Sequence, residues 1–333
     1  MKRVEIGGWG APEDVAQCVD ARELPSPGAG EVVFDVLAFP INPADLAFCR
    51  GRYRLKPPLP ATPGAECVGR VAAVGAGVSR VSPGDLVINL QRENWAQRRL
   101  VREQDVIRLP PGIDLQQAAM VRINPPTAQL LLSDIVLLKP GDWLIQNVAN
   151  SAVGRLVIGM AKRAGYRTLN VTRRDDVFDE LKALGADACL LDGDDLSDRA
   201  RSATGGAPIR LGLDAVSGAA TARIAGCLAD DATVCNYGSM SGEDPQISSP
   251  DVVYRGVTLT GFMLGRFLAR RSIPQVEAIY ADLMRAVQSG AIYAPIGAVY
   301  PIEQIGDALR HAQRAGHDGK ILVAPNGPIR EVS

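Results

Sequence analysis

Residues 1–122 carry short apolar stretches that alternate with glycine and proline. The clearest stretches cover residues 32–38, 68–74 and 85–89, and turn sequences stand before two of them, PSPGAGE at 25–31 and VSPGDLV at 81–87. Short strands at close spacing, separated by turn residues, are typical of a β-rich domain of the barrel kind. This pattern predicts a β-barrel domain at the start of the chain.

From about residue 123 the pattern changes to strands that alternate with helices. Predicted strands cover residues 143–148, 168–172, 188–191, 209–215, 233–237 and 257–264, with helices at 151–163 and 178–184. Such alternation indicates a parallel sheet with helices on both faces. A further helix is predicted at 274–289 and a short strand at 320–323. We therefore expect an α/β protein with a β-barrel domain at the start of the chain and a doubly wound cofactor domain that begins near residue 123.

Composition narrows the function classes. The 333 residues exceed the usual size of a single core, which agrees with two domains. With 36 basic and 37 acidic residues there is no net positive field for binding nucleic acid or an anionic membrane. Six scattered cysteines without a CxxC pair are expected to be buried thiols in a reducing compartment, and only two histidines argue against hydrolases of the Ser/His/Asp type and against most metal sites.

The turn at residues 149–154 is the clearest candidate for a ligand site. It lies between a predicted strand and a predicted helix, so the first backbone N–H groups of the helix, at Ala152 and Val153, favour a phosphate. Asn150 and Ser151 add side-chain donors, and Gly154 allows close packing of the helix on the sheet. The match to the dinucleotide fingerprint is incomplete, because Asn150, Ser151 and Ala152 stand where glycines are common. A purely structural turn is the alternative.

The end of the next strand predicts which dinucleotide binds. An NAD site usually has an acidic residue there, which binds the ribose hydroxyls. Here Arg173 and Arg174 follow Thr172, and guanidinium groups suit a 2′-phosphate. The sequence therefore predicts NADPH rather than NADH as the cofactor. A solvated arginine pair without a ligand is the alternative.

Four stretches of the chain resemble a known family. They are INPADLAFCRGRYRLKPPLPATPGAECVG, RINPPTAQLLL, IQNVANSAVGR, and NYGSM with the later GFML. They are similar to the medium-chain dehydrogenases/reductases, and most closely to the enoyl thioester reductases of the mitochondrial 2-enoyl-CoA/acyl-carrier-protein reductase type. The resemblance covers nearly the whole chain. It implies a GroES-like catalytic barrel made of residues 1–122 and 267–333, joined to a Rossmann cofactor domain at 123–266.

The zinc-dependent branch of that superfamily is a poorer match. Its cysteine ligand is replaced by Asn42 or Pro43, and its Gly-His-Glu sequence appears as Gly64-Ala65-Glu66 without the histidine. The lobe with four cysteines that holds its structural zinc is absent from the sequence. We therefore expect no metal, and we interpret Glu66 as a buried carboxylate bonded to turn amides.

Without a metal, the group that polarises the substrate is expected to be a protein side chain or the cofactor, and Tyr53 is the candidate side chain. Gly51-Arg52-Tyr53 matches the segment that, in the resembled reductases, carries the proposed catalytic tyrosine. A phenol is protonated at neutral pH and can donate to an enolate. A loop tyrosine that only covers apolar surface is the alternative for Tyr53.

The resemblance also implies further cofactor contacts. Asn124 would lie at the nicotinamide end, residues 150–153 at the pyrophosphate, and Lys320 on the cofactor side. The residues that would line the nicotinamide face are Tyr237, Gly238, Ser239, Met240, Phe262, Met263, Leu264 and Gly265. Three of them depart from the family pattern, since Ser239 replaces a glycine, Met263 a tryptophan and Gly265 a polar residue. Tyr237 and Phe262 could equally be core residues.

The resulting hypothesis is an NADPH-dependent oxidoreductase of fatty acid metabolism that reduces the carbon–carbon double bond of a trans-2-enoyl thioester, bound to CoA or acyl-carrier protein. A zinc-independent quinone oxidoreductase is the second hypothesis. A non-catalytic NADPH-binding sensor or interaction protein is the third, and it belongs to another functional class.

Assembly and location follow from two other features. The strand predicted at 257–264 is apolar and should lie at the edge of the sheet. A second copy of the chain could pair with this strand and form a homodimer. Proline at Thr258 or Thr260 would then remove a backbone N–H that donates to the partner strand. Coverage of this edge by the chain's own C-terminal helix is the alternative.

The first residues lack an apolar signal segment, and only six of the 36 basic residues are lysine, so we expect a cytoplasmic, bacterial protein without a membrane span.

Overall fold

The computed structural model describes residues 1–314 and 319–329 and divides the chain into two compact units. Unit 1 comprises Met1–Ile123 and Ile273–Ser333, and unit 2 comprises Asn124–Ser272. The chain returns to unit 1 after Ser272 rather than after Arg266, where the sequence placed the boundary, because helix α10 (Leu264–Leu268) packs on helix α4 (Asn124–Ser133) of unit 2.

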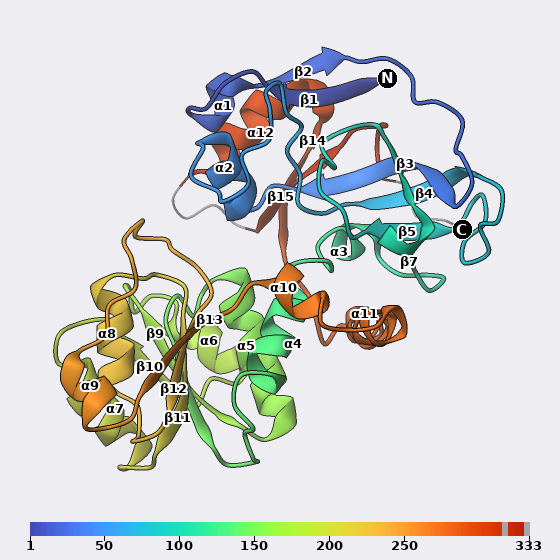
Figure 1. Cartoon of the computed structure of the whole chain (residues 1–333). Helices are drawn as coiled ribbons and strands as arrows, with labels where there is room; N and C mark the ends of the chain where they lie inside the picture. The colour runs from blue at the N-terminus through green and yellow to red at the C-terminus, as the bar shows by residue number, and fades with distance from the viewer. Residues whose placement is uncertain (315–318, 330–333) are drawn as a thin grey trace. The chain divides into compact units, whose positions relative to one another are not determined.

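Unit 1 is built on a seven-stranded sheet in the order β14-β15-β3-β4-β5-β7, with β6 paired to β3, and on a separate β1-β2 hairpin (Figure 1). Its strands are β1 (Lys2–Ile6), β2 (Ala16–Asp20), β3 (Glu31–Pro40), β4 (Val68–Val74), β5 (Leu86–Asn89), β6 (Arg98–Arg102), β7 (Val106–Arg108), β14 (Ile296–Pro301) and β15 (Lys320–Ala324). Its helices are α1 (Pro12–Val15), α2 (Pro43–Cys49), α3 (Leu115–Ala118), α11 (Ile273–Gln288) and α12 (Ile305–Ala312), with short 3-10 turns at Glu103–Asp105 and Ile302–Gln304.

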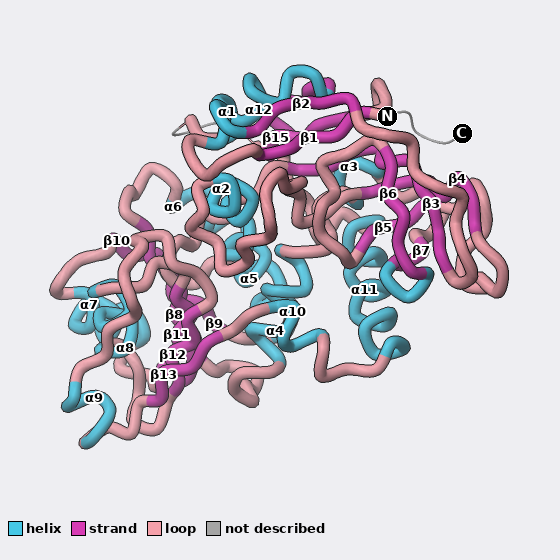
Figure 2. The backbone as a smooth tube through the Cα atoms, turned by 45° about the horizontal axis from the view of Figure 1, so that its top comes forward, coloured by secondary structure: helices cyan, strands magenta, loops and turns pink. Residues whose placement is uncertain are grey.

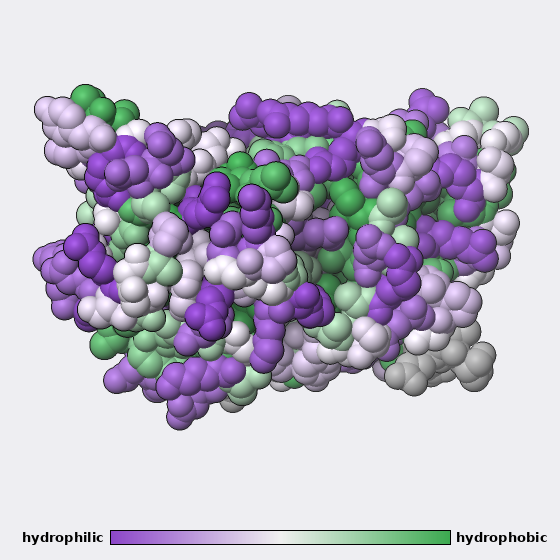
Figure 3. Space-filling view, turned by 90° about the horizontal axis from the view of Figure 1, so that it is seen from below, coloured by the Kyte–Doolittle hydropathy of each residue, from purple (hydrophilic) through white to green (hydrophobic). Residues whose placement is uncertain are grey.

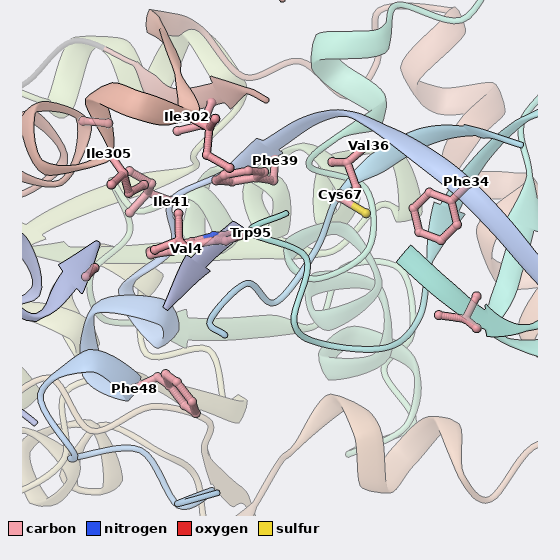
Figure 4. Packing of buried hydrophobic residues seen from close by; sticks show 14 of the residues in the cluster. Val4, Phe34, Val36, Phe39, Ile41, Phe48, Cys67, Trp95, Ile302 and Ile305 are labelled. Atoms are coloured by element: carbon pink, nitrogen blue, oxygen red, sulfur yellow. The ribbon is translucent and has the colours of Figure 1, made fainter. Parts of the chain in front are cut away.

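The core of unit 1 lies between this sheet, the hairpin and α12. Phe39 of β3 stacks on Trp95 with ring centroids 5.7 Å apart, and Val4 and Ile302 belong to the same buried cluster (Figure 4). Tyr53 packs against the edge of this cluster. The barrel-like β domain predicted for the start of the chain is therefore completed by strands and a helix from its end.

Unit 2 is a six-stranded parallel sheet in the order β10-β9-β8-β11-β12-β13, with helices on both faces (Figure 2). Helix α5 packs on α4 and on α6, and α7 packs on α8. The strands are β8 (Trp143–Gln146), β9 (Arg167–Thr172), β10 (Ala188–Leu191), β11 (Ile209–Asp214), β12 (Thr233–Asn236) and β13 (Thr258–Gly261). The remaining helices are α5 (Ala152–Ala164), α6 (Phe178–Leu184), α7 (Leu196–Thr204), α8 (Ala219–Gly226) and α9 (Ser249–Val253). This is the predicted doubly wound fold.

Local sequence explains the boundaries of α5. The Ser151 hydroxyl accepts the backbone N–H of Gly154 at 3.1 Å and so caps the first turn. The helix ends at Gly165, whose φ of 76° lies in the left-handed region that glycine adopts easily. Between these ends, one helix face is buried at Val157, Ile158 and Ala161.

The last strand is shorter than the sequence predicts. β13 ends at Gly261, and Leu264 already begins α10, so the predicted strand at 257–264 is wrong beyond Gly261. β13 does lie at the sheet edge, as predicted. The N–H of Thr258 donates to Ala232 of the neighbouring chain segment, so by the alternation of a strand the N–H groups of Leu259 and Gly261 face outward. Proline at Thr258 or Thr260 would therefore break the internal ladder and not the free edge.

Within residues 1–314 and 319–329, no helix is both long and apolar enough to cross a bilayer. On the face drawn in Figure 3, hydrophilic residues are interspersed with smaller groups of hydrophobic ones.

Candidate active site

The turn between β8 and α5 is shaped to bind an anion. Its backbone passes through a left-handed residue, Val148, with a φ of 50°. A Cβ added to Gly154 would lie 2.5 Å from the carbonyl oxygen of Ala149, so only glycine permits this close approach of helix and turn. The amides of Ala152 and Val153 lie in the first helical turn, where no intrahelical acceptor exists. These donors fit a phosphate of a dinucleotide.

A buried carboxylate ties the ends of three strands together beside this turn. Asp214 ends β11 and is fully buried. Its Oδ1 accepts hydrogen bonds from Asn147 Nδ2 at 2.5 Å and from the backbone N–H of Val216 at 2.9 Å, and its Oδ2 accepts from Thr221 Oγ1 at 2.6 Å and Asn236 Nδ2 at 2.9 Å. Strand order reverses between β8 and β11, which is where doubly wound sheets bind ligands. Asp214 thus organises the binding edge through its neighbours.

Tyr237, directly after β12, offers an unsatisfied group at the same edge. Its phenolic oxygen is buried without a hydrogen bond of normal geometry in the described part of the chain. Burial raises the pKa of Tyr237, and the Ser151 hydroxyl counteracts this in part. Buried polar groups are normally satisfied, so an unpartnered phenol beside the phosphate turn fits a site that a ligand completes.

The other residues predicted to bind cofactor in unit 2 follow the carboxyl ends of parallel strands or begin a helix. Gly238 approaches the backbone closely, since its Cβ would lie 2.8 Å from Ala215 O. Ser239 and Met240 are exposed, and Phe262 is buried against Phe267, with ring centroids 4.4 Å apart. The remaining positions are Asn150 in the phosphate turn, Asn124 at the start of α4, Met263 as the N-cap residue of α10, and Leu264 with Gly265 in its first turn.

The two arginines after β9 differ in their surroundings. Both are exposed. Arg174 forms an ion pair with Asp176, with Nε and Oδ1 3.3 Å apart, whereas no ion pair of Arg173 occurs among the described residues. Arg173 is therefore the more available cation for a 2′-phosphate.

Unit 1 contains a second cluster of polar residues around α2. Asn42, the N-cap residue, donates to Glu66 Oε1 at 2.7 Å and accepts from Lys320 Nζ at 2.5 Å. Asp45 and Glu66 are fully buried. Burial raises the pKa of Glu66 to about 7 and lowers the pKa of Lys320. Glu66 Oε2 also accepts the backbone N–H of Ile123 at 3.0 Å, in keeping with the interpretation of Glu66 as a carboxylate that bonds to a turn amide.

Tyr53 lies near this cluster, on the segment after α2. It is half-buried, and the guanidinium of Arg92 lies over its ring, with Cζ 4.7 Å from the ring centroid. Arg92 Nη1 is 3.4 Å from Tyr53 Oη. The sequence did not indicate Arg92, because nothing in its local pattern shows that the loop after β5 packs on the segment after α2.

No group of three or more His, Cys, Asp or Glu residues that could hold a metal occurs among the described residues. A surface depression of about 410 Å³ lies beside the loop after β5. It is lined by Glu31, Gln91, Arg92, Glu93, Arg99, Leu100, Val101, Arg102 and Asp105. Six of these nine residues are charged, so the depression does not suit an apolar acyl chain.

Known proteins resemble this chain over nearly its full length. The mitochondrial enoyl-[acyl-carrier-protein] reductase of Rattus norvegicus is 34% identical over 321 residues, which cover 94% of this chain and 86% of that protein. The chain belongs to the enoyl-[acyl-carrier-protein] reductase family. The family member of Dictyostelium discoideum is 30% identical over 333 residues, covering 97% of this chain and 94% of its own.

Domain models and solved structures match both parts of the chain and agree with its fold. Models of the alcohol dehydrogenase GroES-like domain and of the zinc-binding dehydrogenase match residues 28–110 and 152–282. The mitochondrial 2-enoyl thioester reductase heterodimer from Candida tropicalis has a TM-score of 0.85 and 25% identity, covering 97% of this chain and 99% of that one. A Bacillus thuringiensis protein provisionally named an NADPH:quinone reductase has a TM-score of 0.91 and 27% identity, covering 97% and 98%.

The resemblance derived from the sequence is thereby confirmed, together with the GroES-like and Rossmann-like fold. The roles of the individual residues remain predictions. Lys320 in particular belongs to unit 1, where its ammonium bonds to Asn42. Asp214 and Arg92 were missed by the sequence analysis. An aspartate that directly follows the apolar strand residues 211–213 was the one available signal for Asp214.

Proposed function

We propose that this protein reduces the carbon–carbon double bond of a trans-2-enoyl thioester with NADPH. Family membership supports the reaction, and a related structure is described as a complex with NADP and crotonyl-CoA. The observation in this chain that carries the proposal is the place of Tyr53, a half-buried phenol held under a guanidinium in the segment that matches the family's tyrosine. Glu66 is fully buried and bonds to Asn42, whose side chain also accepts from Lys320, so these residues would support α2, and Lys320 stays a predicted cofactor-side residue.

The residues of unit 2 would bind the cofactor. The phosphate turn at 150–153 would hold the pyrophosphate, and Arg173 would contact the 2′-phosphate. The buried phenolic oxygen of Tyr237 would form a hydrogen bond to the cofactor. When bound, NADPH supplies the hydride that adds to the β-carbon of the substrate. Negative charge then develops on the thioester oxygen, and Tyr53 donates its proton to the α-carbon.

A second candidate is the reduction of quinones, favoured by the high structural similarity to the B. thuringiensis protein. A direct assay separates the candidates. Purified protein is mixed with NADPH and either crotonyl-CoA or a simple benzoquinone, and the loss of the near-ultraviolet absorbance of the reduced nicotinamide is followed. Oxidation with crotonyl-CoA is the expected result. Oxidation with the quinone alone would replace the proposal by the second candidate, and binding of NADPH without turnover of either substrate would indicate a non-catalytic protein.

We also propose that the protein is a homodimer that pairs through β13. The outward N–H groups of Leu259 and Gly261 leave donors at the sheet edge, and a second copy of the same strand would satisfy both edges. The enoyl-[acyl-carrier-protein] reductases of Rattus norvegicus and Dictyostelium discoideum are mitochondrial, whereas the scarcity of lysine supports our expectation of a bacterial enzyme, and we propose a cytoplasmic location.

A further inference from the structure

Arg92 and Tyr53 form a stacked pair on the surface of the unit 1 core. The guanidinium carbon of Arg92 lies 4.7 Å from the Tyr53 ring centroid and 5.8 Å from that of Phe48. Arg92 Nη1 donates to Tyr53 Oη at 3.4 Å, a long hydrogen bond. One side chain thus contacts both the ring and the oxygen of the predicted proton donor.

The loop that carries Arg92 is anchored on both sides. Asn89 Oδ1 accepts the backbone N–H of Gln91 at 3.0 Å, and Gln91 Nε2 donates to Asp105 Oδ1 at 2.8 Å. On the other side, Arg99 Nη2 donates to the carbonyl oxygen of Arg92 at 3.0 Å. These bonds fix the backbone of Arg92, so the position of its guanidinium is a property of the fold.

A buried carboxylate lies near the second terminal nitrogen of the guanidinium. Arg92 Nη2 lies 3.7 Å from Asp45 Oδ1, and Asp45 is fully buried. Asp45 already accepts the backbone N–H groups of Asn42 at 3.0 Å and Ala65 at 2.9 Å, so it attracts Arg92 without forming a hydrogen bond to it. Arg92 Nη2 itself has no hydrogen-bond partner in the described part of the chain. The ion pair with Asp45 therefore holds the cation in place, while no hydrogen bond takes up Nη2.

We propose that Arg92 is a positioning residue for Tyr53, an inference that rests on the proposed role of Tyr53 as proton donor. When the O–H bond of Tyr53 breaks and a C–H bond forms at the substrate α-carbon, the electron pair stays on the phenolic oxygen. Arg92 remains protonated and stabilises that negative oxygen, until a proton from water restores the phenol. The stacked contact holds the ring in one orientation throughout.

The test compares Arg92→Ala and Arg92→Lys with a matched control, Arg54→Gln. Arg54 is an exposed cation next to Tyr53 in sequence, and no hydrogen bond or ion pair of its side chain occurs among the described residues. Arg92→Ala should lower kcat by about 10- to 100-fold, the usual worth of a hydrogen bond to a charged group, with little change in KM or in NADPH binding. Arg92→Lys should recover part of the loss, and the control should stay near wild type.

Two further readouts separate positioning from simple support of the fold. Because Arg92 lines the surface depression, free guanidinium ion can reach the space left by Arg92→Ala and should restore part of kcat. In a Tyr53→Phe background, Arg92→Ala should have little additional effect, since the two residues act as a unit. Loss of activity that guanidinium does not restore, or that adds fully to the Tyr53→Phe effect, would overturn the role of Arg92. A Tyr53→Phe enzyme with normal kcat would instead overturn the proposed proton donor, and the inference with it.

Discussion

Replacing Glu66 with Gln should change how the stability of the protein depends on pH. Glu66 is fully buried, and burial raises its pKa from 4.5 to about 7, although Lys320, Asn42 and Arg122 oppose this shift. The native state therefore holds the Glu66 proton more tightly than the unfolded chain does. The stability that this proton contributes is fully present below about pH 4.5 and is lost as the pH rises through about 7.

The size of the pKa shift of Glu66 gives the expected change in the free energy of unfolding. A change from 4.5 to about 7 corresponds to about 3 kcal/mol, at roughly 1.4 kcal/mol for each pKa unit. Most of this, roughly 2 to 3 kcal/mol, should be lost between about pH 5 and about pH 8. Glu66→Gln also has a cost that does not depend on pH, because one amide oxygen cannot replace both carboxylate oxygens toward Asn42 and Ile123.

Urea unfolding of the wild type and of Glu66→Gln at the two pH values measures the effect. The free energy of unfolding of the wild type, minus that of the variant, should be larger at the lower pH by the stated amount. Glu93→Gln, at a side chain that is 60% exposed, is the matched control and should change the pH slope much less. An equal difference at both pH values would refute the reasoning that burial controls the ionisation of Glu66.

Three other predictions concern the cofactor, the proton donor and the assembly. Replacing both Arg173 and Arg174 with Ala should raise KM for NADPH by about 10- to 100-fold and change KM for NADH only slightly, with most of the effect from Arg173. Equal effects on both cofactors in steady-state kinetics would exclude a contact with the 2′-phosphate. Tyr53→Phe should keep NADPH binding, measured by fluorescence titration, and lower kcat by about 10²- to 10⁴-fold, so turnover within a few-fold of wild type would show that Tyr53 only packs. Gly261→Pro should shift the dimer toward monomer in sedimentation because it removes an outward N–H, whereas Gly261→Ala should not. A wild-type chain that sediments as a 35.3 kDa monomer would contradict the proposed dimer.

Local patterns predicted the six strands of unit 2 because each is a short apolar run that is continuous in sequence, but of its helices they predicted only α5 and α6 and missed α4, α7, α8, α9 and α10. The predicted bounds 178–184 and 188–191 are those of α6 and β10, where apolar periodicity and a following glycine define helix and strand. The strand predicted at 257–264 was too long because apolar residues after Gly261 pack as the start of a helix, with Phe262 against Phe267. Periodicity alone does not distinguish these two uses of an apolar run.

The features that the sequence did not predict depend on contacts between distant residues. β14 joins the sheet of unit 1 by pairing in parallel with β15, and β15 in turn pairs with β3, where Leu322 lies opposite Pro40 from the start of the chain. Arg92 meets Tyr53 through the same kind of long-range packing. Tyr53 and the phosphate turn were found because their residue types and spacing match a family, whereas a single arginine in a loop has no such pattern.

The most direct measurement of the proposed reaction is the position of isotopic label in the product. Crotonyl-CoA is reduced with NADPH that carries deuterium at the transferable position of C4, and separately with ordinary NADPH in deuterated water. The account predicts deuterium on the β-carbon of the saturated thioester in the first experiment and on the α-carbon in the second, as determined by NMR spectroscopy. Label at the α-carbon from the cofactor, or no transfer of cofactor label to the product, would contradict it.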